Sequence, residues 1–123
     1  MSKRILIVDD EDDILNLVRL ILEDAGFECE TARNGKEGLN AIHQQHFDLV
    51  LLDIMMPVLT GWEVLRFLRD NEQTRNLPVA MLTARAFSAE TPGIELTAYS
   101  DYIMKPFEPD DLVERVKKIL TTK

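Results

Sequence analysis

Cysteine is almost absent from this sequence, and long apolar runs are missing altogether. Cys29 is the only cysteine, so an intramolecular disulfide is excluded. No stretch is apolar over the length that a bilayer span requires. The apolar run that follows Met1–Arg4 is too short for a signal peptide and has no small-residue cleavage site after it. These absences favour a cytoplasmic globular protein that has no membrane partner.

Basic residues are scarce compared with acidic ones. The chain has 14 Lys and Arg residues against 22 Asp and Glu residues, which gives a formal net charge of −8. Such a surface repels phosphate backbones, so we expect no direct binding of nucleic acid. Linkers, repeats and low-complexity tracts are also missing, and 123 residues suit a single domain over residues 1–123.

Short, continuous apolar runs predict the strands of a sheet. They cover residues 5–8, 49–52 and 79–82, and residues 27–31 and 101–104 are weaker candidates. An unbroken apolar run is typical of a parallel strand that is covered on both faces. Amphipathic stretches separate the runs, so a β-α pattern repeated five times predicts an α/β domain with helices on both faces of a parallel sheet.

Apolar residues at helical spacing predict the helices. Helices are expected after Asn34–Gly35 and after Gly61, and the last one begins at Pro109, which suits the first helical position. The first helix is predicted to end at Gly26. It should bury one face, formed by Ile14, Leu17, Val18, Ile21, Leu22 and Ala25.

One predicted helix is irregular. It should lie within residues 86–100, between the fourth and fifth strands, where the pair Pro92–Gly93 occurs. Proline inside a helix removes a backbone donor and clashes with the preceding turn. We therefore expect this helix to be short, shifted or broken.

Polar side chains follow four of the five predicted strands. Asp9 and Asp10 come after the first strand, Asp53 after the third, Thr83 after the fourth and Lys105 after the fifth. Ligands of such sheets bind outside the carboxyl ends of the strands, so these residues should share one site. Crowded carboxylates attract a hard cation such as Mg²⁺ or Mn²⁺. Asp53 would then act as a nucleophile toward phosphorus, while the metal, Lys105 and Thr83 stabilise the developing charge.

Four segments carry a specific resemblance. They read ILIVDDE at residues 5–11, LVLLDIMMP at 49–57, LTAR at 82–85 and DYIMKPF at 101–107. Taken together and in this order, they resemble the receiver domain of two-component response regulators, over residues 3 to about 120. The resemblance implies a flavodoxin-like doubly wound (βα)5 fold, with a five-stranded parallel sheet in the strand order 2-1-3-4-5.

The same resemblance implies the chemistry of two-component signal transduction. Asp53 would accept a phosphoryl group from the phosphohistidine of a histidine kinase or a histidine phosphotransfer protein. Asp10 would bind Mg²⁺ directly, Asp9 largely through water, and Met55 through its backbone carbonyl. Such a domain is a regulatory phosphoacceptor rather than an enzyme, with only self-phosphorylation and self-dephosphorylation chemistry of its own.

A conformational switch is also implied. Thr83 and Tyr102 would form the switch pair, and Lys105 would contact the phosphoryl group next to a cis bond to Pro106. Departures from the family pattern occur at Leu59–Gly61 and, together with Pro92, between the fourth and fifth strands. An output partner or output domain would dock near the last two strand-helix units, and a phosphorylation-dependent homodimer is also implied. A stand-alone regulator and one domain of a longer protein both remain open.

Two other function classes remain as alternatives. An aspartyl-phosphate phosphohydrolase would carry a second Asp two residues after the nucleophile, where this chain has Met55, and would need a cap domain. A degenerate receiver that serves only as an interaction module typically loses the acceptor or a member of the acid pair, and this chain retains both.

Several polar or aromatic residues have simpler interpretations. Residues 11–13 are expected to be a solvated helix start, and Tyr102 alternatively packs as an ordinary aromatic residue. His43 and His46 lack other ligands at zinc spacing and should be surface residues on a helix. Trp62 is expected on the exposed side of its helix.

Overall fold

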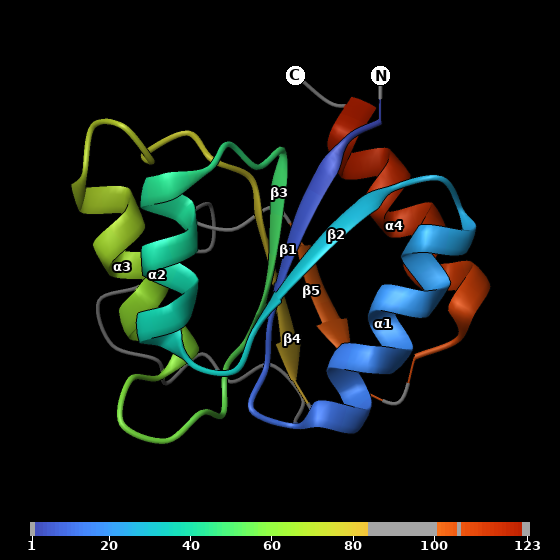
Figure 1. Cartoon of the computed structure of the whole chain (residues 1–123), viewed down its shortest axis with the longest axis horizontal. Coiled ribbons are helices and arrows are strands. Elements are labelled where there is room, and N and C mark those ends of the chain that lie inside the picture. The colour runs from blue at the N-terminus through green and yellow to red at the C-terminus, as the bar shows by residue number, and fades with distance from the viewer. Residues whose placement is uncertain (1, 84–100, 106, 122–123) are drawn as a thin grey trace.

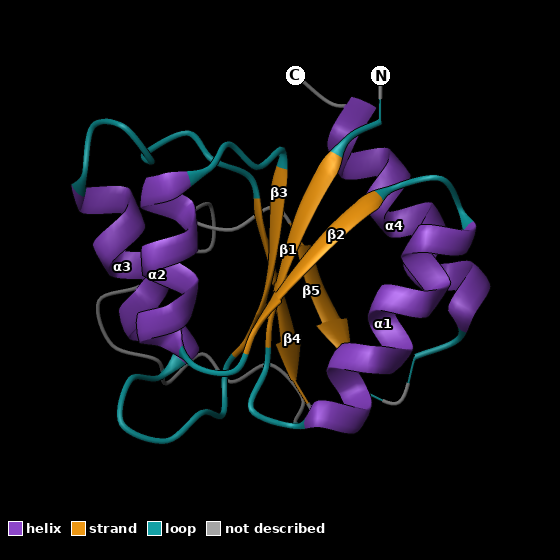
Figure 2. Cartoon of the chain, in the orientation of Figure 1, coloured by secondary structure: helices purple, strands orange, loops and turns teal. Residues whose placement is uncertain are grey.

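A computed structural model describes residues 2–83, 101–105 and 107–121, and for residues 83, 101, 102 and 104 it describes the backbone only. Five strands form one sheet in the order β2-β1-β3-β4-β5, with every neighbouring pair parallel (Figure 1, Figure 2). The predicted strand order is therefore confirmed. The strands are β1 (Arg4–Val8), β2 (Glu28–Ala32), β3 (Leu49–Asp53), β4 (Val79–Thr83) and β5 (Asp101–Met104).

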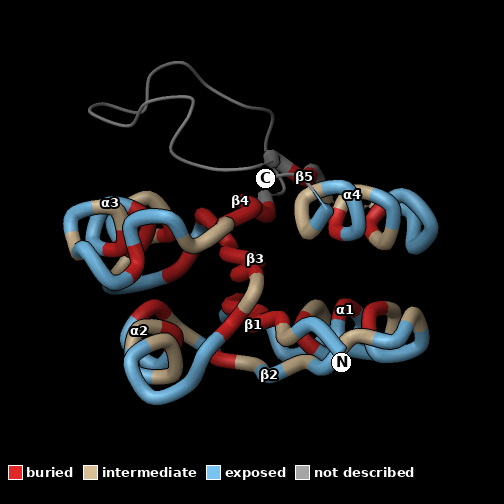
Figure 3. Tube along the Cα trace, turned by 90° about the horizontal axis from the view of Figure 1, so that it is seen from above, coloured by how far each residue is buried: buried red, intermediate tan, exposed pale blue. Residues whose placement is uncertain are grey.

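Helices cover both faces of this sheet, which is the flavodoxin-like doubly wound arrangement. Seen from above, α2 and α3 lie on one side of the strands, and α1 and α4 lie on the other (Figure 3). The helix that we predicted within residues 86–100 lies outside the described residues. The described helices are α1 (Asp12–Asp24), α2 (Gly35–Gln44), α3 (Gly61–Asp70) and α4 (Pro109–Thr121). None of them is long and apolar enough to cross a membrane.

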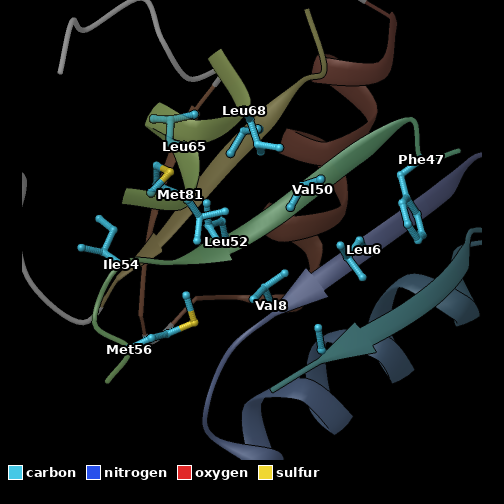
Figure 4. Packing of buried hydrophobic residues seen from close by; sticks show 13 residues of the cluster. Leu6, Val8, Phe47, Val50, Leu52, Ile54, Met56, Leu65, Leu68 and Met81 are labelled. Atoms are coloured by element: carbon cyan, nitrogen blue, oxygen red, sulfur yellow. The ribbon is translucent and has the colours of Figure 1, made fainter. Parts of the chain in front are cut away.

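Alternating residues of each strand divide the core into two clusters, because successive side chains of a strand point to opposite faces. Leu6 and Leu52 belong to the cluster under α2 and α3, which is shown in Figure 4. Ile7 and Leu51 belong to the cluster under α1 and α4. All four side chains are fully buried, and burying one such side chain contributes about 1.5–3 kcal/mol. The sheet is apolar on both faces, as the continuous runs predicted.

The strand register brings the carboxyl ends of the strands to one edge. Val8 pairs with Leu52, so the residue after β1 lies beside the end of β3. Asp53 pairs with Leu82, and Leu82 pairs with Ile103 in β5. Residues at the carboxyl ends of β1, β3 and β5 therefore share one edge of the sheet, although they are far apart in the sequence.

Local signals set the helix ends. The side chain of Asn34 accepts a hydrogen bond from the backbone N–H of Glu37 at 2.8 Å, which caps α2. Thr60 and Glu63 form a reciprocal capping box at the start of α3. After α1, Gly26 has a φ of 99°, a conformation that favours glycine.

The buried face of α1 differs from our prediction at two positions. Leu17 is 45% exposed, whereas Leu15, Val18 and Leu22 are buried against the sheet. The prediction is confirmed for Val18 and Leu22, which are buried, and for Ile14 and Ile21, which pack against the cluster under α1 and α4. It was wrong at Leu17 and it missed Leu15, because apolar residues also flank this face and helical spacing alone did not fix the rotation of α1. Packing against β1 and β2 decides it, and it leaves Leu17 and Leu20 in solvent.

The start of β2, the two histidines and Trp62 differ in smaller ways from the predictions. The second strand begins at Glu28 rather than at Phe27. His43 and His46 are exposed as expected, but His46 lies beyond the end of α2. Trp62 is half-buried and packs against the cluster under α2 and α3, so it is not a fully exposed side chain.

Candidate functional site

A cluster of carboxylates lies at the carboxyl edge of the sheet. Asp9 and Asp10 follow β1, and Asp53 is the last residue of β3. Carboxylate oxygens from these three residues lie within 4.8 Å of one another. Asp9 and Asp53 are buried and Asp10 is exposed, so the cluster opens to solvent on one side.

Asp53 contacts both the backbone that follows β3 and the side chain of Lys105. Its Oδ1 accepts a hydrogen bond from the backbone N–H of Met55 at 3.3 Å and lies 3.6 Å from Nζ of Lys105. Burial, and then the charge of Asp9, raise the pKa of Asp53 to about 7, although Lys105 and the Met55 hydrogen bond act in the opposite direction. In the absence of a cation, the site therefore disfavours the ionised form of this carboxyl group.

Lys105 provides the positive charge of the site from the segment after β5. Its Nζ donates to Oδ2 of Asp9 at 2.7 Å, and only 9% of its side chain is exposed. Burial alone would lower the pKa of Lys105, but the hydrogen bond to Asp9 and the charges of Asp53, Asp9 and Glu11 raise it. Lys105 is therefore a firmly protonated ammonium group beside Asp53.

The loop between β3 and α3 fixes the position of Asp53. The backbone N–H of Gly61 donates to the carbonyl of Ile54 at 3.0 Å, which draws the start of α3 against the end of β3. A Cβ atom at Gly61 would lie 2.8 Å from Cα of Ile54 and would collide with the backbone carbonyl of Asp53. Glycine is therefore required for this close approach.

A tight turn shapes the same loop. The N–H of Leu59 donates to the carbonyl of Pro57 at 2.7 Å, and Val58 between them has a φ of 69°. This is the left-handed region, which costs a β-branched residue free energy. The side chain of Val58 is fully exposed, and that of Met55 is about half exposed, so neither forms part of the core.

The donor set fits a hard divalent cation. Three carboxylates face one ammonium group, so negative charge is in excess, and the raised pKa of Asp53 reflects this excess together with burial. No hydrogen bond joins Asp10 to any of the other described residues, so its oxygens are available to a ligand. Oxygen ligands with one or two carboxylates match the preference of Mg²⁺.

The other predicted residues are placed only in part. Thr83 ends β4 with its backbone paired to Met104, and Tyr102 lies in β5 opposite Met81. The side chains of both residues, and the whole of Pro106, lie outside the described part of the chain. The rotamers of the predicted switch pair and the predicted cis bond therefore remain predictions.

Glu11 is a residue that the sequence interpretation missed. We expected it to be part of a solvated helix start, but its Oε1 lies 3.5 Å from Nζ of Lys105. Its side chain is 62% exposed, and its backbone N–H donates to Oδ1 of Asp9 at 2.9 Å. No local pattern connects residues 94 positions apart, so only its adjacency to Asp9 and Asp10 could have drawn attention to it.

Similarity to known proteins extends over almost the whole chain. The family model of the response regulator receiver domain matches residues 5–117. The chain is 42% identical over 121 residues to the phosphate regulon transcriptional regulatory protein PhoB of Pseudomonas aeruginosa, covering 98% of this chain and 52% of that protein. It is also 42% identical to the transcriptional regulatory protein SrrA of Staphylococcus aureus, covering 98% of this chain and 48% of that protein. The chain thus spans about half the length of these curated relatives.

Solved structures show the same similarity. A CheY-like response regulator receiver domain protein from Methanospirillum hungatei superposes with a TM-score of 0.88 at 40% identity, covering 98% of this chain and 94% of that one. The response regulator TrrA of Thermotoga maritima, crystallised in complex with Mg²⁺ and BeF, superposes with a TM-score of 0.84 at 38% identity. That match covers 96% of this chain and 99% of TrrA.

Proposed function

Because this chain belongs to the response regulator receiver domain family and is a regulatory domain of two-component systems, we propose that Asp53 is its phosphoacceptor. The convergence of Asp9, Asp10 and Asp53 with Lys105 carries this proposal. It combines a nucleophile, acidic cation ligands and a fixed ammonium group at one edge of the sheet. These are the parts that phosphoryl transfer requires.

In the proposed reaction, an oxygen of the Asp53 carboxylate attacks the phosphorus of a phosphohistidine. The phosphorus–nitrogen bond breaks, the electron pair leaves with the imidazole, and the ring takes up a proton. Lys105 is near enough to Asp53 to stabilise the charge on the transferred group, because its Nζ lies 3.6 Å from Oδ1. The donor would be a histidine kinase or a histidine phosphotransfer protein.

The residues that would hold Mg²⁺, or Mn²⁺, are Asp10, Asp53, the backbone carbonyl of Met55 and, largely through water, Asp9. When bound, the cation supplies positive charge that favours ionised Asp53 and stabilises phosphoryl oxygens. The exposure of Asp10 and its lack of hydrogen bonds to the other described residues support its direct role. Asp9 already accepts hydrogen bonds from Lys105 and Glu11, which supports a more indirect one.

Phosphorylation of the isolated protein tests this proposal. Incubation with acetyl phosphate and Mg²⁺ should add the mass of one phosphoryl group, and a chelator should prevent the gain. Asp53→Asn should abolish the gain, whereas Asp48→Asn, at the opposite end of the sheet, should retain it. Intact mass spectrometry measures both. Undiminished labelling of Asp53→Asn would show that the acceptor is another residue, and an unlabelled wild type would leave the interaction-module alternative.

We propose further that Thr83 and Tyr102 transmit the phosphorylated state to a partner surface near the last two strand-helix units. The backbone of Thr83 lies at the carboxyl end of β4, next to β3, which ends in Asp53. A phosphoryl group adds up to about two negative charges and strong acceptor oxygens, which would attract the Thr83 hydroxyl. An output partner, a linked output domain or a second copy would then sense the change.

Hydrogen exchange with and without beryllofluoride, an acyl-phosphate mimic, tests the switch. Protection should change most between residues 83 and 107, beyond the loops that form the site. Changes confined to the loops around Asp9 and Asp53 would contradict the switch and would leave a domain that only stores or relays phosphoryl groups.

A further inference from the structure

Lys105 has three carboxylate neighbours, and one of them, Glu11, has no part in the proposed phosphoryl transfer. Its Nζ lies 2.7 Å from Oδ2 of Asp9, 3.5 Å from Oε1 of Glu11 and 3.6 Å from Oδ1 of Asp53. A lysine ammonium group has three N–H donors, so it can address all three carboxylates at once. The position of Nζ is therefore influenced by the attraction of three carboxylates.

Glu11 occupies an unusual place for a helix start. It is the N-cap residue of α1, yet its side chain makes no capping hydrogen bond. N-cap side chains usually accept a hydrogen bond from the backbone N–H groups of the first turn. The Glu11 carboxylate instead lies within ion-pair distance of Lys105, while its backbone N–H donates to Asp9.

Only two of the three carboxylates near Lys105 also belong to the candidate cation site. Asp9 and Asp53 belong to the cluster whose oxygens lie within 4.8 Å of those of Asp10, and Glu11 does not. A cation in that cluster draws on the negative charge of Asp9 and Asp53, which weakens their attraction for Lys105. The charge of Glu11 remains available to Lys105 in that state.

We propose that Glu11 is a positioning residue for Lys105. It keeps Nζ beside Asp53 when a cation takes up the charge of Asp9, and it leaves the third N–H of Lys105 for the phosphoryl group. This inference rests on the proposed function of Asp53. If Glu11 and Lys105 formed only a surface ion pair, loss of Glu11 would affect stability and leave phosphorylation unchanged. If Glu11 positions Lys105, its loss should also slow phosphorylation.

The test compares Glu11→Gln with Asp13→Asn. Both changes remove one negative charge from the acidic start of α1, but Asp13 is exposed and makes no ion pair with the other described residues. The rate of acetyl phosphate labelling at saturating Mg²⁺ should fall roughly two- to fivefold in Glu11→Gln, the range for one ion pair that is partly exposed. Asp13→Asn should label at the wild-type rate. Calorimetric titration should give Mg²⁺ affinities for the two variants that agree with each other.

A double-mutant cycle separates positioning from any general effect of charge. In a Lys105→Met background, Glu11→Gln should slow labelling no further, because the group that it positions is gone. Urea unfolding of every variant shows that each one is folded. Equal slowing by Glu11→Gln and Asp13→Asn, or an undiminished effect of Glu11→Gln without Lys105, would overturn the inference. A wild type that fails to label would instead overturn the proposed function and this inference together.

Discussion

Each end of the sheet has an aspartate with a shifted pKa, and the two shifts are in opposite directions. At the amino end, the backbone N–H of Arg4 donates to Asp48 at 2.8 Å, and His46 lies 3.2 Å from the same carboxylate. Although burial acts to raise the pKa of Asp48, these hydrogen bonds and the nearby positive charges lower it. At the carboxyl end, burial and Asp9 raise the pKa of Asp53 to about 7.

The two carboxylates therefore have different roles. Ionised Asp48 stabilises the fold, whereas ionised Asp53 is stabilised only when a ligand binds. The ionised form of Asp48 is favoured by its neighbours, so folding gains from it. The ionised form of Asp53 is disfavoured until a cation or a phosphoryl group changes its surroundings. The carboxyl end therefore holds a destabilising arrangement that the rest of the domain offsets, as is common at functional sites.

The largest effect is expected where the backbone is packed most closely. Gly61→Ala, at the carboxyl end, should lower the free energy of unfolding by about 2–3 kcal/mol, because the new Cβ meets the backbone of Asp53 and Ile54. Gly26→Ala, at the amino end, should cost only about 1 kcal/mol, since no atom lies within 4 Å of its added Cβ and only the positive φ opposes it. Urea denaturation measures both. Equal losses would mean that the approach of α3 to β3 is not a special constraint.

The matched substitutions Asp53→Asn and Asp48→Asn should change stability in opposite directions when a chelator is present. At pH 8, Asp53→Asn should raise the free energy of unfolding by about 1 kcal/mol or more, because it removes a carboxylate whose ionisation the folded state disfavours. Asp48→Asn should lower it by about 1 kcal/mol, because it weakens the hydrogen bonds to Arg4 and His46. The same sign for both variants would contradict the distinction between the two ends.

The pH dependence of the metal-free protein follows from the same shift. The unfolded chain releases the Asp53 proton near pH 3.8, and the folded protein releases it near pH 7. Between these values the folded state binds more protons, so the contribution of Asp53 to stability should fall as the pH rises and level off above about pH 7. Asp53→Asn should remove this slope, whereas Asp48→Asn should keep it between pH 5 and pH 7. A slope that persists in Asp53→Asn would assign it to another group.

The smallest effect is expected at Val58, in the loop at the carboxyl end. It is the one non-glycine residue with positive φ among residues 2–83, 101–105 and 107–121. Val58→Gly should raise the free energy of unfolding by a few tenths of a kcal/mol, because relief of the left-handed conformation slightly exceeds the entropy cost of glycine. Val58→Ala is the matched control and should gain less than Val58→Gly, since alanine is also disfavoured at positive φ. An equal gain with alanine would point to the exposed side chain instead.

Much of the fold and of the site could be predicted from local patterns. The apolar runs identified the strands, and Gly26, Gly61 and Pro109 marked the helix ends, because these signals act over a few residues. Side chains at the carboxyl ends of parallel strands, such as Asp9 and Asp53, must share an edge wherever those strands pair. The predicted bounds failed by one residue at the start of β2, where the apolar signal is weak.

What the sequence by itself determined is the set of elements and the chemical types at the sheet edge. The tertiary structure decided which face of α1 is buried, that Glu11 approaches Lys105, and that the pKa of Asp53 rises while that of Asp48 falls. The physical reason is the distance along the chain over which each effect acts. Helical spacing and strand runs are local, whereas burial and electrostatic interactions depend on distances in space. Lys105 and Asp9 are separated by 96 positions in the sequence, and Nζ of Lys105 lies 2.7 Å from Oδ2 of Asp9 in the folded protein. The strand order and register bring both residues to one edge of the sheet, and the long lysine side chain spans the remaining distance.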